Sequence, residues 1–203
     1  MCLVSDAGGS TAVGDRFDHA VYDSLMREYH DTLSAPVLRF GGEPLNPKGD
    51  GFLCVWRTPS APASSLEVRR RACVAALEMS EASNRLNERV LPEQRLPTRI
   101  GLHVGPVTIA SDADRGTFDV VGHAANVAAR LQGLNRTLET SVLASQDVVD
   151  GLEEALALRR LDWPVTLEGI SQAPVVFEIC GRGVAGPVAR RPAEQPAVAT
   201  GSV

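Results

Sequence analysis

Two aspartates stand where a carboxylate can take part in chemistry. Asp6 ends a short apolar run and precedes a Gly-Gly-Ser-Thr turn, and Asp50 lies between two glycines at the tip of a predicted hairpin. A hairpin tip can lie beside the end of a neighbouring strand, so both carboxylates could hold the same hard cations. Magnesium prefers oxygen ligands, typically one or two carboxylates together with phosphate oxygens. Taken alone, each aspartate is better explained by ordinary turn chemistry.

The turn after Asp6 has a composition that suits phosphate binding. Glycine has no Cβ, so backbone N–H groups in such a turn can approach a phosphate closely. The residues that we expect to act in this way are Gly8, Gly9, Ser10 and Thr11.

A third group of polar residues lies within residues 117–131. Asp119 lies in a predicted strand, and Asn126 and Arg130 are four residues apart near the start of a predicted helix. That spacing puts both side chains on one helix face. An acid, an amide and a guanidinium could therefore converge on one pocket. The alternative is a capped helix with an exposed arginine.

The elements that must position these groups follow from the apolar pattern. Residues 2–5 read as a buried strand, and apolar residues then step by four from Phe17 to Leu33, which predicts a helix that is kinked at Pro36 and stops at Gly41-Gly42. Further along, we expect strands at 43–48, 51–56, 99–107, 117–121, 140–144 and 173–180, and helices through 72–86, from 126 and over 145–153.

This order contains the β-α-β-β-α-β arrangement of a ferredoxin-like core, followed by further α/β elements. The predicted class is α/β of the α+β type, with one domain over residues 1–180 and a disordered tail over 181–203, which is rich in Pro, Ala, Gly and Val.

Composition excludes several classes of protein. The chain has 203 residues, 44% of them hydrophobic, and a net charge of -5, which argues against a nucleic-acid partner. No apolar run approaches the roughly 18 residues that span a bilayer, and the first residues do not resemble a signal peptide. The cysteines, Cys2, Cys54, Cys73 and Cys180, lack the spacing of a zinc site. We therefore expect free thiols in a cytoplasmic protein with no membrane partner.

Three blocks of sequence, taken together, resemble the class III adenylyl/guanylyl cyclases, particularly their bacterial branch. The first is Ser-Asp-Ala-Gly-Gly-Ser-Thr at 5–11, and the second is Lys-Gly-Asp-Gly-Phe-Leu at 48–53. The third runs from Arg-Ile-Gly-Leu-His-Val-Gly at 99–105 through Phe118-Asp119 to Asn-Val-Ala-Ala-Arg-Leu at 126–131. A fainter match continues to residue 178, so the resemblance covers roughly residues 2–180.

The resemblance implies an adenylyl cyclase that converts ATP to 3′,5′-cyclic AMP and pyrophosphate. It also implies a class III cyclase fold and a homodimer in which each site combines residues of both subunits. Two Mg²⁺ or Mn²⁺ ions per site would be held by Asp6, Asp50 and the carbonyl of Ala7. Arg99 would lie near the polyphosphate, and Asp119 would select adenine through its exocyclic amine. Asn126 would orient the ribose, and Arg130 would stabilise the charge that develops at phosphorus.

The sequence departs from the family at several positions. A lysine that helps to read adenine is replaced by Asn46, although Lys48 is close by, and a second lysine that binds phosphate is replaced by Glu168. Pro44 and Pro47 fall in a strand that should pair, and each removes a backbone donor.

These departures keep an alternative open, namely a degenerate cyclase-homology domain that serves in dimerisation or nucleotide sensing. A guanylyl cyclase is a third hypothesis. A diguanylate cyclase would need paired acids in the hairpin, which Gly49-Asp50-Gly51-Phe52 lacks. Because the predicted domain begins close to residue 1, we expect either a separate regulatory protein or a domain without regulation.

Overall fold

The computed structural model of this chain describes residues 1–48, 50–57, 62–112, 117–161, 174–183 and 189–191. In this part of the chain the strands form an eight-stranded sheet with the order β10-β8-β9-β7-β4-β1-β3-β2, and a separate two-stranded ribbon, β5-β6. The strands of the sheet are β1 (Cys2–Ala7), β2 (Glu43–Lys48), β3 (Gly51–Val55), β4 (Thr98–His103), β7 (Val142–Ser145), β8 (Leu156–Leu161), β9 (Val176–Arg182) and β10 (Ala189–Arg191). The helices are α1 (Ser10–Arg16), α2 (His19–Arg39), α3 (Pro62–Arg89), α4 (His123–Leu138) and α5 (Gln146–Val149), with a short 3-10 turn at Pro92–Gln94.

The predicted ferredoxin-like core is confirmed. In chain order its elements are β1, α2, β2, β3, α3 and β4, and its strands lie side by side as β4-β1-β3-β2, all antiparallel. β7 then adds to β4 in parallel, and β9, β8 and β10 extend the sheet beyond it. This arrangement is the predicted α+β class with added C-terminal elements.

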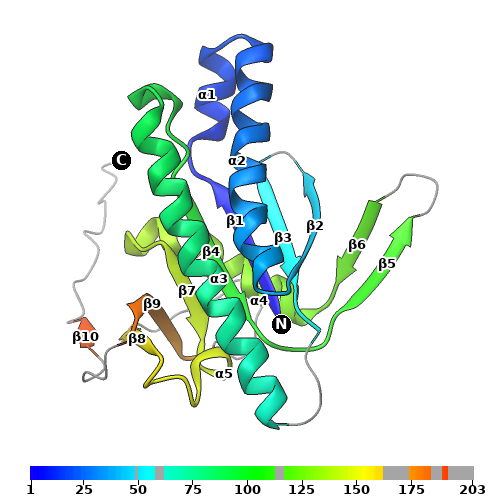
Figure 1. The fold of residues 1–203 in the computed structure, drawn as a ribbon, viewed down its shortest axis with the longest axis vertical. Coiled ribbons are helices and arrows are strands. Elements are labelled where there is room, and N and C mark those ends of the chain that lie inside the picture. Colours follow the sequence, from blue (N-terminus) through cyan, green and yellow to red (C-terminus); the bar gives the residue numbers. More distant parts are fainter. Residues whose placement is uncertain (49, 58–61, 113–116, 162–173, 184–188, 192–203) are drawn as a thin grey trace, which may run out of the picture.

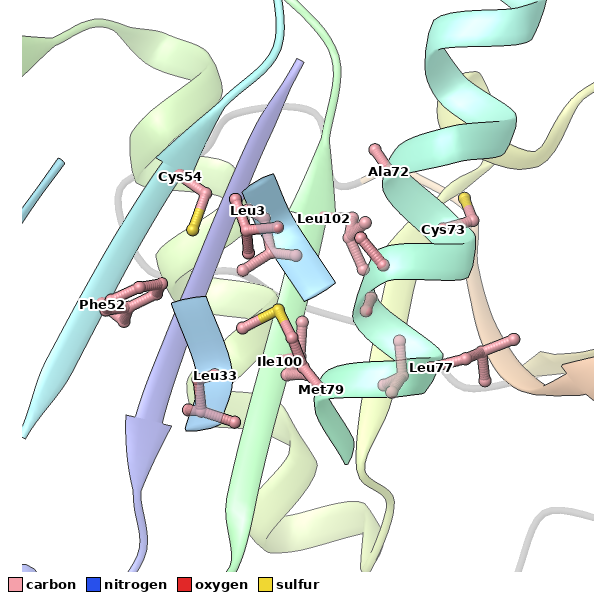
Figure 2. Close-up of a cluster of buried hydrophobic side chains, with 14 of the residues drawn as sticks. Leu3, Leu33, Phe52, Cys54, Ala72, Cys73, Leu77, Met79, Ile100 and Leu102 are labelled. Atoms are coloured by element: carbon pink, nitrogen blue, oxygen red, sulfur yellow. The ribbon is translucent and has the colours of Figure 1, made fainter. Parts of the chain in front are cut away.

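Helices cover both faces of the sheet (Figure 1). α2 and α3 pack on one face, where Leu33 and Met79 meet Leu3, Phe52 and Ile100 of the strands (Figure 2). Each of these five side chains is at most 2% exposed, so this contact forms the main hydrophobic core. Among the described residues, no helix is long and apolar enough to cross a membrane.

α4 packs on the opposite face, against β1 and β4. Its small residues Ala124 and Ala128 are fully buried there beside Cys2 and Val55. The approach is so close at Gly101 of β4 that a Cβ on that residue would overlap the carbonyl oxygen of Ala128. Gly101 therefore sets how near α4 lies to the sheet.

The ribbon of β5 (Thr108–Asp112) and β6 (Thr117–Val121) projects away from the body of the molecule (Figure 1). It is antiparallel and leads directly into α4. β6 also contacts β2, the last strand at this edge of the sheet.

Several predicted elements differ in extent from the observed ones. The strand predicted over 99–107 spans Thr98–His103, and a further strand, β5, which the sequence did not reveal, begins at Thr108. β8 was missed as well, and α4 begins three residues earlier than predicted. β9 continues to Arg182 and residues 189–191 form β10, so the tail predicted from 181 onward contains paired backbone, and its other residues lie outside the described part of the chain.

The two prolines of β2 are accommodated by its position. β2 is the edge strand and pairs only with β3 in the sheet, so a missing N–H need not break a second ladder. The pairing is also irregular between Leu45 and Lys48, where the register shifts. Pro44 and Pro47 are therefore compatible with a paired strand.

Candidate active site

Two carboxylates meet at the end of β1. Asp6 lies opposite Gly51 in its last pair with β3, and opposite Arg99 in the last pair but one with β4. The neighbouring β2–β3 turn carries Asp50, and its carbonyl accepts a hydrogen bond from the N–H of Ala7 at 3.2 Å. The turn is thereby attached to the end of β1, which brings Asp50 beside Asp6 as the sequence predicted.

The pKa of the Asp6 carboxyl is raised above its ordinary value. Partial burial is the largest cause, followed by repulsion from the Asp50 carboxylate, while the positive charge of Arg99 acts in the opposite direction. A side-chain hydrogen bond with Asp50 is the smallest of these causes and also raises the pKa. A cation between them would remove the repulsion.

The oxygens present here fit a hard divalent ion such as Mg²⁺ or Mn²⁺. In the described part of the chain, no group of three or more His, Cys, Asp or Glu side chains is placed to hold a metal. A metal at Asp6 and Asp50 would thus need further oxygens from a backbone carbonyl, water or a nucleotide phosphate. Mg²⁺ usually binds in this way, through one or two carboxylates plus substrate phosphates.

Gly8 makes room for Arg99. Its own N–H donates to the carbonyl of Pro97 at 2.8 Å, so this amide is already used within the protein. A Cβ on Gly8 would lie 3.0 Å from Nη1 of Arg99, closer than side chains normally approach. The absence of a side chain at Gly8 therefore lets the guanidinium lie across the turn, next to Asp6.

The turn ends in the first residues of α1. Gly9 has a φ of 85°, a left-handed conformation that glycine adopts without strain, and the helix begins at Ser10. The N–H groups at the start of an α-helix have no partner within the helix. The backbone N–H groups of Ser10 and of the exposed Thr11 are two of these, and both residues are among those predicted to bind phosphate.

The side chain of Ser10 has a contact that sequence reasoning missed. Its hydroxyl donates a hydrogen bond to Oδ2 of Asp50, forty residues away, and Ser10 is only 3% exposed. The prediction for Ser10 concerned its backbone alone. The signal that could have revealed this contact was the polar side chain of Ser10, which needs a hydrogen-bond partner because the fold buries it.

A chain of buried hydroxyls lies behind the carboxylates. The Tyr29 hydroxyl of α2 and Oγ1 of Thr98 are 2.9 Å apart, and Thr98 donates to Oγ of Ser83 in α3 at 2.7 Å. Thr98 lies opposite Ala7 and next to Arg99. The network thus connects both helices of one face to the strand ends that carry the candidate site.

The second half of the predicted site lies on α4 and the ribbon. Asn126 and Arg130 are exposed, while Val127 and Leu131 beside them are buried, so both polar residues occupy the outer side of α4. Asp119 lies in β6 opposite Ala110, and Asn46 lies in β2, the strand that contacts β6. The backbone therefore brings the two predicted base-reading positions to neighbouring strands, whereas Glu168 lies outside the described residues.

Comparison with known families decides what kind of site this is. A sequence profile described as "Adenylate and Guanylate cyclase catalytic domain" matches residues 5–175, which include every predicted site residue. The chain belongs to this family of cyclase catalytic domains. The resemblance that the sequence blocks indicated is confirmed.

Curated relatives of this cyclase domain include bacterial adenylate cyclases. It is 32% identical to adenylate cyclase 2 of Rhizobium meliloti (strain 1021), over 94% of this chain and 52% of that protein. It is also 32% identical to adenylate cyclase 1 of the same organism, over 78% of this chain and 24% of that protein. The chain thus spans about half or less of the length of these relatives.

Solved cyclase structures share the fold. The adenylyl cyclase CyaB from P. aeruginosa superimposes with a TM-score of 0.73 at 18% identity, over 88% of this chain and 91% of that one. The guanylyl cyclase Cya2 superimposes with a TM-score of 0.72 at 20% identity, over 93% and 94% of the two chains. Since both kinds of cyclase match equally well, the fold does not discriminate between ATP and GTP.

Proposed function

We propose that this domain is an adenylyl cyclase that converts ATP to 3′,5′-cyclic AMP and pyrophosphate. The observation that carries the proposal is the placement of Asp6 and Asp50 together at the end of β1, where Asp6 pairs with Arg99 and the Ala7 N–H donates to the Asp50 carbonyl, in a chain of the cyclase family. The relatives named adenylate cyclases support the choice of ATP.

The reaction is an in-line attack of the ribose 3′-hydroxyl on the α-phosphate. Phosphoryl transfer depends mainly on positioning the reactants and on stabilising charge. Asp6, Asp50 and the Ala7 carbonyl would hold two Mg²⁺ or Mn²⁺ ions, which supply activation of the attacking oxygen and neutralisation of the leaving one.

Arg99 would bind the polyphosphate beside these carboxylates. Its guanidinium lies next to Gly8, where the turn that precedes α1 comes closest. A planar guanidinium with several donors suits phosphate oxygens. Gly9, Ser10 and Thr11 would add backbone N–H groups to the same phosphates.

The residues of α4 and the ribbon would act on the nucleoside. Asn126 orients the ribose, and Arg130 stabilises charge at phosphorus. Asp119 accepts a hydrogen bond from the exocyclic amine of adenine, and Asn46 donates to a ring nitrogen. The contact between β2 and β6 supports a joint role of Asn46 and Asp119.

The two halves of the site would come from different subunits of a homodimer. This part of the proposal is supported by the exposure of Asn126 and Arg130, since side chains on the outer face of α4 can reach a second copy of the chain. One dimer would then contain two equivalent sites.

The experiment is a cyclase assay of the purified protein with Mn²⁺ and either ATP or GTP, followed by separation of the cyclic products. We expect cyclic AMP from the wild type and none from Asp50→Ala. A wild type that binds ATP but forms neither cyclic nucleotide, with Mn²⁺ present, would favour the degenerate nucleotide-sensing module instead.

A further inference from the structure

We infer that Ser10 is a positioning residue for the metal carboxylates: its hydroxyl holds Asp50 beside Asp6 before a metal binds. The inference rests on the proposed function, because it takes Asp6 and Asp50 as the metal ligands. It concerns the side chain of Ser10, whereas the proposed function uses only the backbone N–H.

The geometry restricts the Ser10 hydroxyl to this task. Ser10 is 3% exposed, and its Oγ donates to Oδ2 of Asp50. A serine near a helix start commonly caps that helix with its side chain, but the N-cap of α1 is Gly9, and no side chain caps this end. The hydroxyl of Ser10 is therefore used across the fold, between α1 and the β2–β3 turn.

The hydrogen bond opposes the electrostatic repulsion between the two carboxylates. Asp6 and Asp50 repel each other, and this repulsion contributes to the raised pKa of Asp6. Two carboxylates of like charge move apart into solvent unless something restrains them. The Ala7 N–H restrains the backbone of Asp50 at 3.2 Å, and the Ser10 hydroxyl restrains its carboxylate.

The hydrogen bond is compatible with metal binding. An ionised carboxylate has about four lone-pair sites, so Oδ2 of Asp50 can accept from Ser10 and still leave positions for a cation. Hydrogen bonds to metal-ligating carboxylates fix their orientation, and their loss commonly costs 10- to 100-fold in metal affinity or activity.

The test measures Mn²⁺ binding without nucleotide, by electron paramagnetic resonance of free Mn²⁺, on the full chain. We expect Ser10→Ala to raise the Mn²⁺ dissociation constant roughly tenfold. Ser10→Thr retains a hydroxyl and should stay within about threefold of wild type. Ser24→Ala removes an exposed hydroxyl of α2 and is the matched control, for which we expect no change. In the cyclase assay, Ser10→Ala should raise the Mn²⁺ concentration for half-maximal activity by the same factor.

Asp50→Asn separates the inference from the proposed function. If Asp50→Asn weakens Mn²⁺ binding but Ser10→Ala does not, the positioning role of Ser10 is wrong and the metal site stands. If Asp50→Asn leaves Mn²⁺ binding intact, the metal site itself is wrong, and the inference is lost with it. A Ser10→Ala protein with lower kcat and unchanged Mn²⁺ affinity would show that Ser10 serves another purpose.

Discussion

At the residue scale, the surroundings of the Asp6 carboxyl, partial burial first and Asp50 second, favour its protonated form in the metal-free protein. The pKa of Asp6 is raised above its ordinary 3.8 by burial and by Asp50, so the folded protein binds a proton there more tightly than the unfolded chain does. A group with a raised folded-state pKa contributes most below its unfolded pKa, and that contribution is lost as the pH rises through the folded value. Asp6 is thus least favourable to folding at neutral pH.

We therefore expect Asp6→Asn to raise the melting temperature of the metal-free protein at about pH 7, because the neutral amide removes both the burial penalty and the repulsion. The gain should shrink as the pH falls toward 3.8, where the wild-type carboxyl becomes protonated. Thermal unfolding followed by circular dichroism over this pH range gives the measurement. Saturating Mn²⁺ should stabilise the wild type more than the variant. A gain that stays constant with pH would mean that charge is not its cause.

Base selectivity is a second residue-scale prediction. Guanine presents a carbonyl oxygen where adenine has its amine, so GTP would leave an acceptor facing Asp119 at a cost of about 1–3 kcal/mol. ATP should therefore be preferred roughly ten- to a hundred-fold in kcat/KM. Asn46→Lys restores the residue typical of the family and should raise activity with ATP. Equal kcat/KM for ATP and GTP in the wild type would exclude Asp119 as the base reader.

At the element scale, the sequence predicted what depends on local pattern and missed what depends on contacts. The four-residue apolar step identified α2, and Gly49-Asp50-Gly51 identified the hairpin. β8 escaped because Leu, Ala and Arg, which make up its run Leu-Ala-Leu-Arg-Arg-Leu, favour helix, and it becomes a strand by pairing with β9. The Ser10–Asp50 contact escaped for the same reason, since α1 and the hairpin meet only in the folded chain.

The distance between α4 and the sheet depends on one glycine. A Cβ at Gly101 would overlap the carbonyl of Ala128, so Gly101→Ala must displace α4 and with it Asn126 and Arg130. We expect a loss of about 1–3 kcal/mol in the free energy of unfolding, as for other overpacked sites. Cyclase activity should fall at least tenfold, while Mn²⁺ affinity, which depends on Asp6 and Asp50 and not on α4, should change little.

Gly133→Ala is the matched control. Gly133 lies exposed within α4, and a Cβ there would meet nothing within 4 Å. Alanine should stabilise this helix by up to about 1 kcal/mol. Denaturant unfolding of both variants measures whether Gly101→Ala lowers the free energy of unfolding and Gly133→Ala raises it. A Gly101→Ala protein with normal stability and activity would mean that α4 does not need its close approach.

At the scale of the whole molecule, the two halves of the proposed site differ in their surroundings. The carboxylates are half-buried at the end of β1, where turn, strand and α1 already hold them together. Asn126 and Arg130 face outward on α4. A site completed by a second copy of the chain accounts for both arrangements, and closed two-fold symmetry would then produce two sites per dimer.

Mixing inactive variants tests this sharing. Asp6→Ala and Arg130→Ala should each abolish activity, but in their heterodimer one site collects both lesions and the other collects none. With free exchange of equal amounts, half of the dimers are heterodimers with one intact site, so activity should recover to about a quarter of the wild-type value for the same number of chains.

Mixing Asp6→Ala with Asp50→Ala is the control: each site of that heterodimer lacks one carboxylate, and activity should stay absent. Recovery in both mixtures, or in neither after exchange is verified by mass spectrometry of differently tagged chains, would contradict the shared site. Recovery in the first mixture alone is possible only if the carboxylates of one subunit act together with Arg130 of the other.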